Sequence, residues 1–141
     1  MPLTTYLDIV SAEALIYSGP ATKVVVPAEA GEICVLARHA PLLTRIRPGL
    51  IRLANELEVE QTFFVSSGFI EIQPYIVTIL ADTVLRAPQM DDAAARAALE
   101  RTRDALAAHP PPADYDRLKV QLNMELALLR AIDQIRRQGR R

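Results

Sequence analysis

The hydrophobic pattern of this 141-residue chain changes its period near residue 87, and this change constrains the fold more than any other feature. Before it, short apolar runs alternate with polar residues, and prolines and glycines separate the runs, which is typical of strands and turns. After Met90, strong helix formers dominate. The pattern therefore predicts two domains, an antiparallel β-sandwich of eight to ten short strands at residues 1–86 and a two-helix hairpin at residues 87–141.

Alternating apolar and polar residues also predict where the individual strands lie. A strand at residues 14–17 should end at the turn sequence Ser18-Gly19-Pro20, and a strand at residues 23–26 should end at Pro27. Residues 76–81 are apolar at both parities, so this strand should be covered on both faces, by a second layer or by a partner. Further strands are predicted at residues 3–9, on each side of a turn at His39-Ala40-Pro41, and at residues 50–54, 58–66 and 70–73.

The single cysteine, Cys34, limits the chemistry of the chain. One cysteine excludes an internal disulfide and suits a reducing compartment. Because it lies in the apolar run Ile33-Cys34-Val35-Leu36, we expect a small buried side chain rather than a reactive thiol.

Two helices are expected in the C-terminal part. Asp91 or Asp92 can cap the first, at residues 93–108, and the prolines after His109 should stop it. Asp114 is the expected cap of the second helix, which should run to about Arg137. The inward stripe of the first helix is thin and consists of Ala95, Leu99, Thr102 and Leu106.

The second helix has a broader apolar face than the first helix can cover. Either it also packs on the sandwich or it leaves a surface for another protein, and the sequence permits both. Its two adjacent stripes are Tyr115, Leu118, Leu122, Leu126 and Leu129, and Met124, Leu128, Ala131, Ile132 and Ile135.

Charge is divided unequally between the two parts. Residues 1–86 carry six Lys/Arg against nine Asp/Glu, whereas residues 87–141 carry ten against eight. The basic part is therefore expected to seek an acidic partner. No apolar run approaches the ~20 residues that span a bilayer, and no signal sequence opens the chain, so we expect it to be neither exported nor embedded in a membrane.

A search for catalytic patterns returns no reaction centre. Both common phosphate-binding glycine motifs are missing, and two distant histidines, His39 and His109, do not make a metal site. We interpret His39 as a turn histidine bonded to backbone, and the acidic pairs at the helix starts as caps. The terminal RRQGRR does not indicate nucleic-acid binding, because the pI is about 6.1 and only 5% of residues are aromatic.

Three long motifs resemble those of a known family. They are YLDIVSAEALIYSG, GEICVLARHAPLLTRIRPG and FFVSSGFIEIQPYIVTILADT, and they occur in the family's order along the whole chain. By these motifs the chain resembles the epsilon subunit of bacterial F-type, proton-translocating ATP synthases. The resemblance implies a ten-stranded β-sandwich followed by a helical hairpin.

The resemblance also implies a noncatalytic rotor subunit with no cofactor of its own. Its implied place is the central stalk, at the cytoplasmic face of the bacterial inner membrane, as a peripheral protein beside the gamma subunit and on the ring of c subunits. Glu32, His39 and Leu42 match the loop region that faces the c ring. The helices would inhibit ATP hydrolysis, with Arg117, Lys119 and Arg130 meeting the alpha or beta subunits.

Some positions depart from the family pattern. The glycine of PGHAP is replaced here by Arg38, and one glycine of SGGF by Ser67. Some members bind ATP through [IL]DxxRA at the first helix, where this chain has alanine in place of the arginine. This argues against an ATP site and leaves only Asp91 and Arg130 as candidate nucleotide contacts.

Two other functions stay open on the sequence alone. One is a self-standing β-sandwich binding module whose helices pair with another protein, and the other is a small hydrolase that uses His39. Copurification with the gamma subunit and the c ring would favour the stalk subunit, and turnover by the isolated chain would favour the hydrolase.

Overall fold

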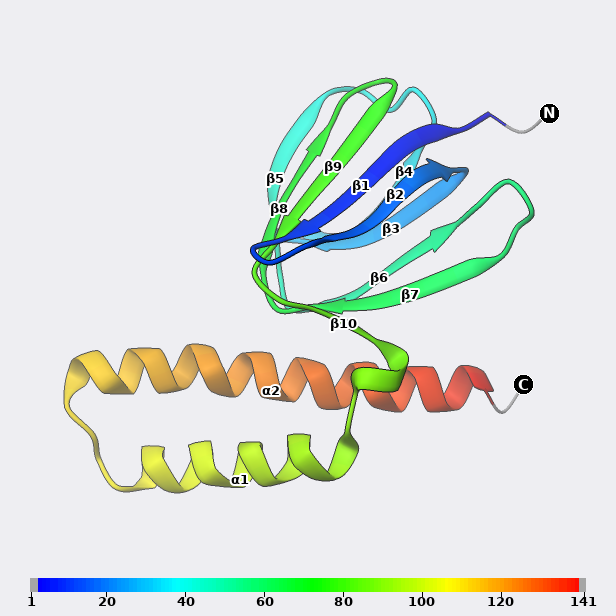
Figure 1. Ribbon diagram of the computed structural model, residues 1–141. Helices are drawn as coiled ribbons and strands as arrows, with labels where there is room; N and C mark the ends of the chain where they lie inside the picture. Colours follow the sequence, from blue (N-terminus) through cyan, green and yellow to red (C-terminus); the bar gives the residue numbers. More distant parts are fainter. Residues whose placement is uncertain (1–2, 140–141) are drawn as a thin grey trace. The chain divides into compact units, whose positions relative to one another are not determined.

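The computed structural model describes residues 3–139 and contains two compact units, Met1–Arg86 and Ala87–Arg141 (Figure 1). No helix within residues 3–139 has the length and apolar character needed to cross a membrane. The first unit contains the strands β1 Thr5–Ser11, β2 Leu15–Ala21, β3 Lys23–Ala28, β4 Gly31–Leu36, β5 Leu42–Ile46, β6 Gly49–Ala54, β7 Glu60–Val65, β8 Gly68–Ile72, β9 Ile76–Ala81 and β10 Val84–Arg86.

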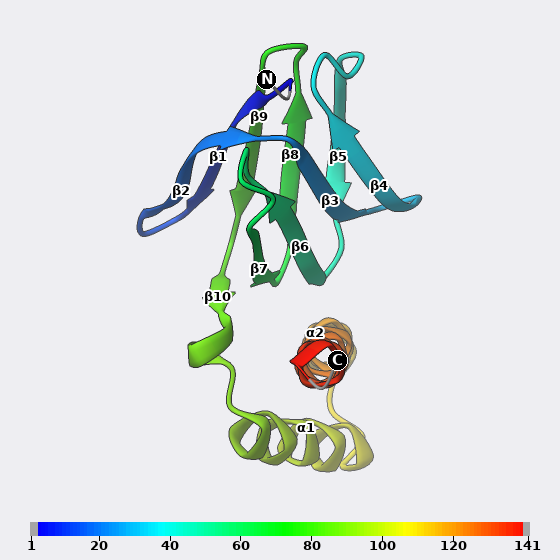
Figure 2. The ribbon, with the colours of Figure 1, turned by 90° about the vertical axis from the view of Figure 1, so that its right-hand side faces the viewer.

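These strands form a sandwich, as predicted. Along the sheet the order is β10-β7-β6-β3-β5-β8-β9-β1-β2, and β4 pairs with the other side of β3. Strands β3 and β5 share only the pair Ala28 and Ile46, and there the sheet passes from one layer to the other (Figure 2). All neighbouring strands are antiparallel except β1 and β9, which run parallel.

The core of the sandwich lies between the two layers. Its members are apolar residues at alternate positions of the strands, as the period of two requires. The largest fully buried side chains of this cluster are Leu7, Ile9, Val24, Val26, Val35, Ile51, Leu53, Phe63, Ile70, Ile72 and Ile79.

Both predicted strand ends at proline are wrong. β2 continues through Ser18-Gly19-Pro20 because it is an edge strand, where the missing N–H of a proline faces no neighbour. β3 also continues through Pro27. On the side of β3 away from β4, the partner strand changes from β6 to β5, and Pro27 lies in the gap between these two ladders. There the Pro27 carbonyl accepts a hydrogen bond from the Arg47 N–H.

One burial prediction is wrong, and another is met on one face of its strand only. Cys34 is exposed, because Val35 faces the core and its neighbours in β4 therefore point outward. In β9, Val77 and Ile79 are buried, but Ile76 and Leu80 are exposed. The described residues thus cover only one face of β9, and the alternative of a covering partner stays open for the other face.

The second unit is a helical hairpin, as predicted. A short 3-10 turn at Ala87–Gln89 leads into α1 Asp92–Ala107, and α2 Pro112–Gly139 returns antiparallel beside it (Figure 1). Asp91 caps α1 as expected, since its carboxylate accepts from the Ala94 N–H at 3.1 Å. The predicted Asp114 cap is wrong, because α2 already begins at Pro112, whose fixed φ suits a first helical position.

The helix stripes are only partly as expected. Ala95, Leu99 and Thr102 of α1 are buried, as the stripe predicts, and Leu106 is half-buried. On α2 most of the predicted apolar residues are half-buried. The buried residues of α2 within the described part are Glu125, Ala131 and Ile132, and burial of Glu125 was not predicted.

Candidate functional site

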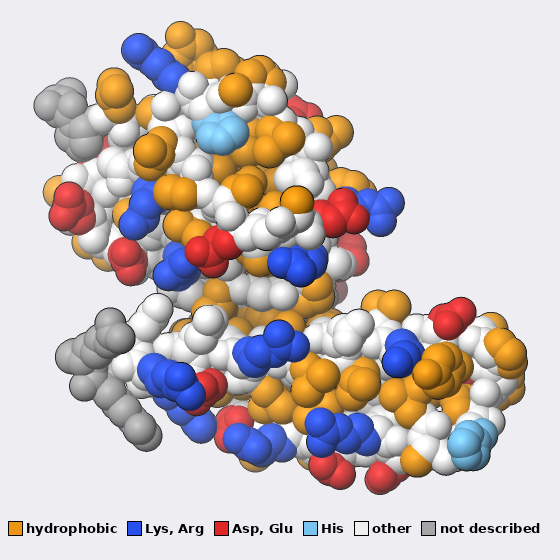
Figure 3. All heavy atoms as spheres, turned by 180° about the vertical axis from the view of Figure 1, so that it is seen from behind, with side chains coloured by type: hydrophobic (Ala, Val, Ile, Leu, Met, Phe, Trp, Pro, Cys, Tyr) orange, Lys and Arg blue, Asp and Glu red, His pale blue; other side chains and the backbone are white. Residues whose placement is uncertain are grey.

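One end of the sandwich carries a cluster of exposed apolar side chains, which we call the loop end. The turn after β4 lies beside the β8–β9 turn, because the Arg38 N–H donates to the Pro74 carbonyl at 3.0 Å. Figure 3 shows hydrophobic side chains spread over the upper part of the sandwich. The exposed apolar residues of the loop end are Leu36, Leu42, Leu43, Tyr75 and Ile76.

His39 and Leu42 both belong to the loop end. The ring Nδ1–H of His39 donates to the Ala40 carbonyl at 2.7 Å, the backbone bond expected of a turn histidine. Leu42 opens β5 and is exposed, and the next residue, Leu43, is 67% exposed. Exposed apolar residues of this density are typical of a protein-binding surface.

Glu32 lies apart from these two residues. It is the second residue of β4, whereas His39 follows the far end of that strand. A strand rises about 3.3 Å per residue, so the four residues from Glu32 to Leu36 separate them by roughly 13 Å. Glu32 instead pairs with Arg52 at 3.2 Å on the surface. The structure brings together two of the three predicted ring contacts and leaves the third elsewhere.

A second exposed apolar surface crosses the layer formed by β5, β8, β9, β1 and β2, and we call it the outer row. Its members are in register across five strands: the exposed apolar residues Phe69, Leu80 and Leu15, the half-buried Val10, and the charged Arg45 at one end. The Arg45 guanidinium lies 5.7 Å from the centre of the Phe69 ring. A shallow groove of about 470 Å³ lies at this place, lined partly by these residues. Sequence analysis missed the outer row, although the apolar residues at both parities of β9 were its signal.

The edge of the same layer contains a perturbed tyrosine. The Tyr17 hydroxyl donates to the Pro20 carbonyl at 3.1 Å. Burial raises the pKa of Tyr17 above its usual 10.0, and the nearby Tyr6 hydroxyl adds to this rise. The phenol therefore stays neutral to a higher pH than a tyrosine in the unfolded chain.

The three basic residues predicted to meet alpha or beta subunits lie along α2. Arg117 pairs with Asp114 in the first turn at 3.5 Å, and the ammonium of Lys119 lies 5.5 Å from the centre of the Tyr115 ring. Arg130 is exposed. These are weak surface contacts, so the side chains can leave them at small cost to meet a partner.

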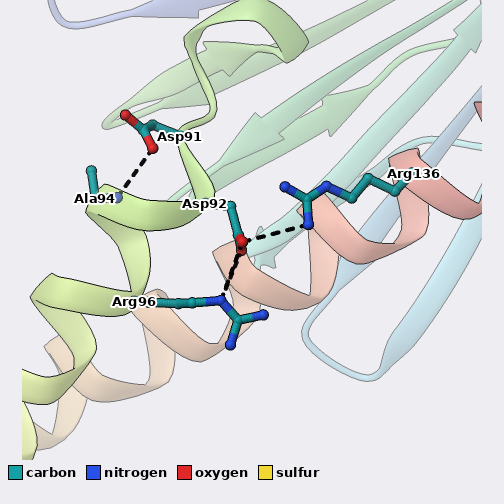
Figure 4. Close-up of polar contacts among 5 residues, drawn as sticks. All are labelled: Asp91, Asp92, Ala94, Arg96 and Arg136. Atoms are coloured by element: carbon teal, nitrogen blue, oxygen red, sulfur yellow. Dashed lines mark hydrogen bonds and ion pairs between the residues drawn. The ribbon is translucent and has the colours of Figure 1, made fainter.

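Within residues 3–139, no hydrogen bond or ion pair joins the two candidate nucleotide contacts, Asp91 and Arg130. The carboxylate of Asp91 is used as the cap of α1. At this end of the hairpin it is Arg136 that reaches α1, where Asp92 pairs with Arg96 at 3.2 Å and with Arg136 at 3.4 Å (Figure 4). Arg130 lies six residues earlier on α2, about 9 Å along the axis. Sequence analysis missed this Asp92 cluster, because the register of two helices cannot be read from the apolar period of either one.

The described residues contain no side-chain group of the kind that binds metal ions. Among residues 3–139 no group of three or more His, Cys, Asp or Glu side chains could hold a metal ion.

Known proteins resemble this chain over nearly its whole length. Residues 4–87 match the family model described as ATP synthase, Delta/Epsilon chain, beta-sandwich domain. The ATP synthase epsilon chain of Alkalilimnicola ehrlichii is 45% identical and covers 98% of this chain and 99% of its own length. That of Nitrosococcus oceani is 44% identical, with coverages of 97% and 98%.

A solved structure shares the fold. A chain in the Euglena gracilis mitochondrial ATP synthase, in an assembly of OSCP, F1 and c-ring, matches with a TM-score of 0.83 and 22% identity, covering 94% of this chain and 83% of that one. The family match over the sandwich and the near full-length identity to two epsilon chains lead to one conclusion: this chain belongs to the family of ATP synthase epsilon chains.

Proposed function

We propose that this chain is the noncatalytic rotor subunit of a bacterial proton-translocating F-type ATP synthase, in which it links the c ring to the gamma subunit. In this proposal it is a peripheral protein at the cytoplasmic face of the inner membrane. The observation that carries the proposal is that the sandwich has two exposed surfaces with apolar side chains, the loop end and the outer row, in addition to its buried core. A rotor link needs two such surfaces on one stiff body.

We assign the loop end to the c ring. His39 and Leu42 lie there, and the turn that holds them is tied to the β8–β9 turn through Arg38 and Pro74. Exposed apolar side chains beside a rigid turn lose little entropy when a partner covers them. Glu32 would reach the ring only from the far end of β4, so we expect it to contribute less than His39.

The loop-end assignment is tested by binding of the purified chain to c-ring preparations. Leu43→Asp places a charge on the surface and should weaken binding by tenfold or more. The matched control is Leu15→Asp, since Leu15 is 61% exposed and pairs with Val10, at the opposite end of β1 from Tyr6, the strand partner of Ile76. Equal binding of both variants would contradict the assignment.

We assign the outer row to the gamma subunit, because it is a second exposed surface that continues across five strands. Phe69 and Leu80 are paired neighbours at its centre. Leu80→Asp should abolish copurification with gamma while leaving the c-ring binding of the chain unchanged. Retained copurification with gamma would refute the assignment without affecting the loop end.

We further propose that the helical hairpin inhibits ATP hydrolysis by the complex. The basic residues Arg117, Lys119 and Arg130 support this, since they are held only by weak surface contacts and can meet acidic segments of alpha or beta subunits. Deleting residues 87–141 should raise hydrolysis and leave assembly and ATP synthesis largely intact. An unchanged hydrolysis rate would show that the hairpin is not inhibitory.

The charges can be tested without truncation. Replacing Arg117, Lys119 and Arg130 together by alanine should raise hydrolysis as the deletion does. Replacing Arg101 and Arg103 on α1 is the control, because both are exposed and lie on the other helix. We propose no ATP site in the hairpin, since the arginines nearest the start of α1 are paired with Asp92.

A further inference from the structure

A layer of polar side chains crosses the helix pair at its middle, and we call it the polar layer. It consists of Thr102 on α1 and Gln121 and Glu125 on α2. Thr102 is 2% exposed and Glu125 is 4% exposed. The Thr102 hydroxyl donates to Glu125 Oε1 at 2.6 Å and accepts from the Gln121 side-chain amide at 3.3 Å.

The hydrogen bonding of the polar layer is incomplete. Glu125 Oε2 is buried, and no residue within the described part of the chain bonds to it. A buried carboxylate that keeps only part of its hydrogen bonds loses more from desolvation than it gains from its contacts. The turns on either side of the layer are apolar, with Leu99 and Leu106 on α1 and Leu122 and Leu129 on α2. An apolar layer here would hold the helices together more strongly.

The same contact also defines how the helices are aligned. A slip by one helical turn would move Glu125 from Thr102 to the level of Leu99 or Leu106, where neither carboxylate oxygen would find a donor. A single buried polar contact can set register in this way at a cost in stability.

We propose that the polar layer fixes the register of α1 against α2 while keeping the closed pair only weakly stable, so that the helices separate far more readily than an apolar pair of this length. The layer is thus a built-in opening point of the hairpin. The inference concerns the helix pair alone and does not depend on the proposed inhibition of hydrolysis.

Amide hydrogen exchange of the full-length chain tests the proposal. The double variant Thr102→Val with Glu125→Met replaces the polar layer by apolar groups of similar shape. The single variant Thr102→Val removes the one hydroxyl that donates to the buried carboxylate within residues 3–139. Glu100→Met is the control, because it makes the same change as Glu125→Met at an exposed position of α1. Amides of the sandwich report in the same measurement that each variant is folded.

The proposal predicts opposite effects of the two variants on the α1 amides. Exchange at the centre of α1 should slow tenfold or more in the double variant and speed up tenfold or more in the single variant. Glu100→Met should change it less than threefold. Unchanged or faster exchange in the double variant would overturn the proposal, and so would unchanged exchange in the single variant.

Discussion

Arg38 holds a backbone conformation that residues with a side chain rarely adopt. Its φ is +63°, in the turn that carries His39. The family pattern has glycine at this position, so the turn geometry explains that glycine. A non-glycine residue in the left-handed region costs about 1–3 kcal/mol. The turn holds Arg38 in this conformation because the Arg38 N–H donates to the Pro74 carbonyl.

Arg38→Gly should therefore stabilise the sandwich by about 0.5–1 kcal/mol, since the relieved strain exceeds the extra chain entropy that glycine loses on folding. Urea unfolding measures the difference. Ala37→Gly is the control, because Ala37 has an ordinary negative φ, and there glycine should only destabilise. A loss of stability in Arg38→Gly would show that the turn is not strained.

Gly68 is needed for a different reason, which is close approach of backbone. A Cβ at this position would lie 2.0 Å from the Leu80 carbonyl oxygen and 2.8 Å from Ala81 Cα. The other glycine of the family's SGGF motif is Ser67 here, which has no positive φ and whose hydroxyl donates to Asp82 at 2.7 Å. Glycine is thus present at position 68, where the packing requires it, and serine occupies position 67, where the packing does not require glycine.

Gly68→Ala should destabilise the sandwich by about 3 kcal/mol, because strands β8 and β9 must move apart. The comparison is Gly19→Ala, whose Cβ would meet only the Tyr17 side chain, at 3.3 Å, and which should cost less than about 1 kcal/mol. Thermal unfolding distinguishes the two. Similar losses in both variants would contradict this account of Gly68.

Tyr17 makes the sandwich sensitive to alkaline pH. Because the folded pKa of Tyr17 lies above its unfolded value of 10.0, the folded state binds the phenolic proton more tightly. The resulting stability is fully present below about pH 10 and is lost as the pH rises through the folded pKa. Between pH 9 and 11, Tyr17→Phe should lose less stability than the natural chain, as measured by urea unfolding. Equal losses of stability in the variant and the natural chain would show that Tyr17 does not contribute to the alkaline sensitivity.

At the scale of single elements, the cap of α1 is the clearest case. Asp91→Ala removes the acceptor of the Ala94 N–H and should cost the helix about 1 kcal/mol. Faster hydrogen exchange in the first turns of α1 would report this loss. Asp91→Asn keeps an acceptor oxygen and should leave exchange nearly unchanged, and a loss equal to that of alanine would argue against capping.

The elements also show where sequence patterns are sufficient. Period-two alternation located most strands, and the β6–β7 connection forms without glycine because the Asn55 side chain accepts from two backbone N–H groups, those of Leu57 and Val59. Proline was misread twice, in β2 and β3. Whether a proline ends a strand depends on which side of the strand has a neighbour, and the sequence does not contain that information.

At the scale of the whole molecule, the sandwich should fold without the helices. All the residues of its core cluster lie within Met1–Arg86. A chain of residues 1–86 should therefore keep the far-ultraviolet dichroism of strands and unfold cooperatively. Loss of cooperative unfolding in this fragment would show that the sandwich needs residues 87–141.

The sequence by itself determined the fold class, the change from strands to helices, the family and that one of two neighbouring aspartates caps α1. These depend on local periods, on motifs and on residues close together in the chain. Only the tertiary structure decided that Cys34 and Leu80 are exposed, that Arg136 rather than Arg130 reaches the start of α1, and that Glu125 is buried against Thr102. The physical reason is that strand neighbours and helix register are set by contacts between distant residues, and a period along one segment carries no information about its partner.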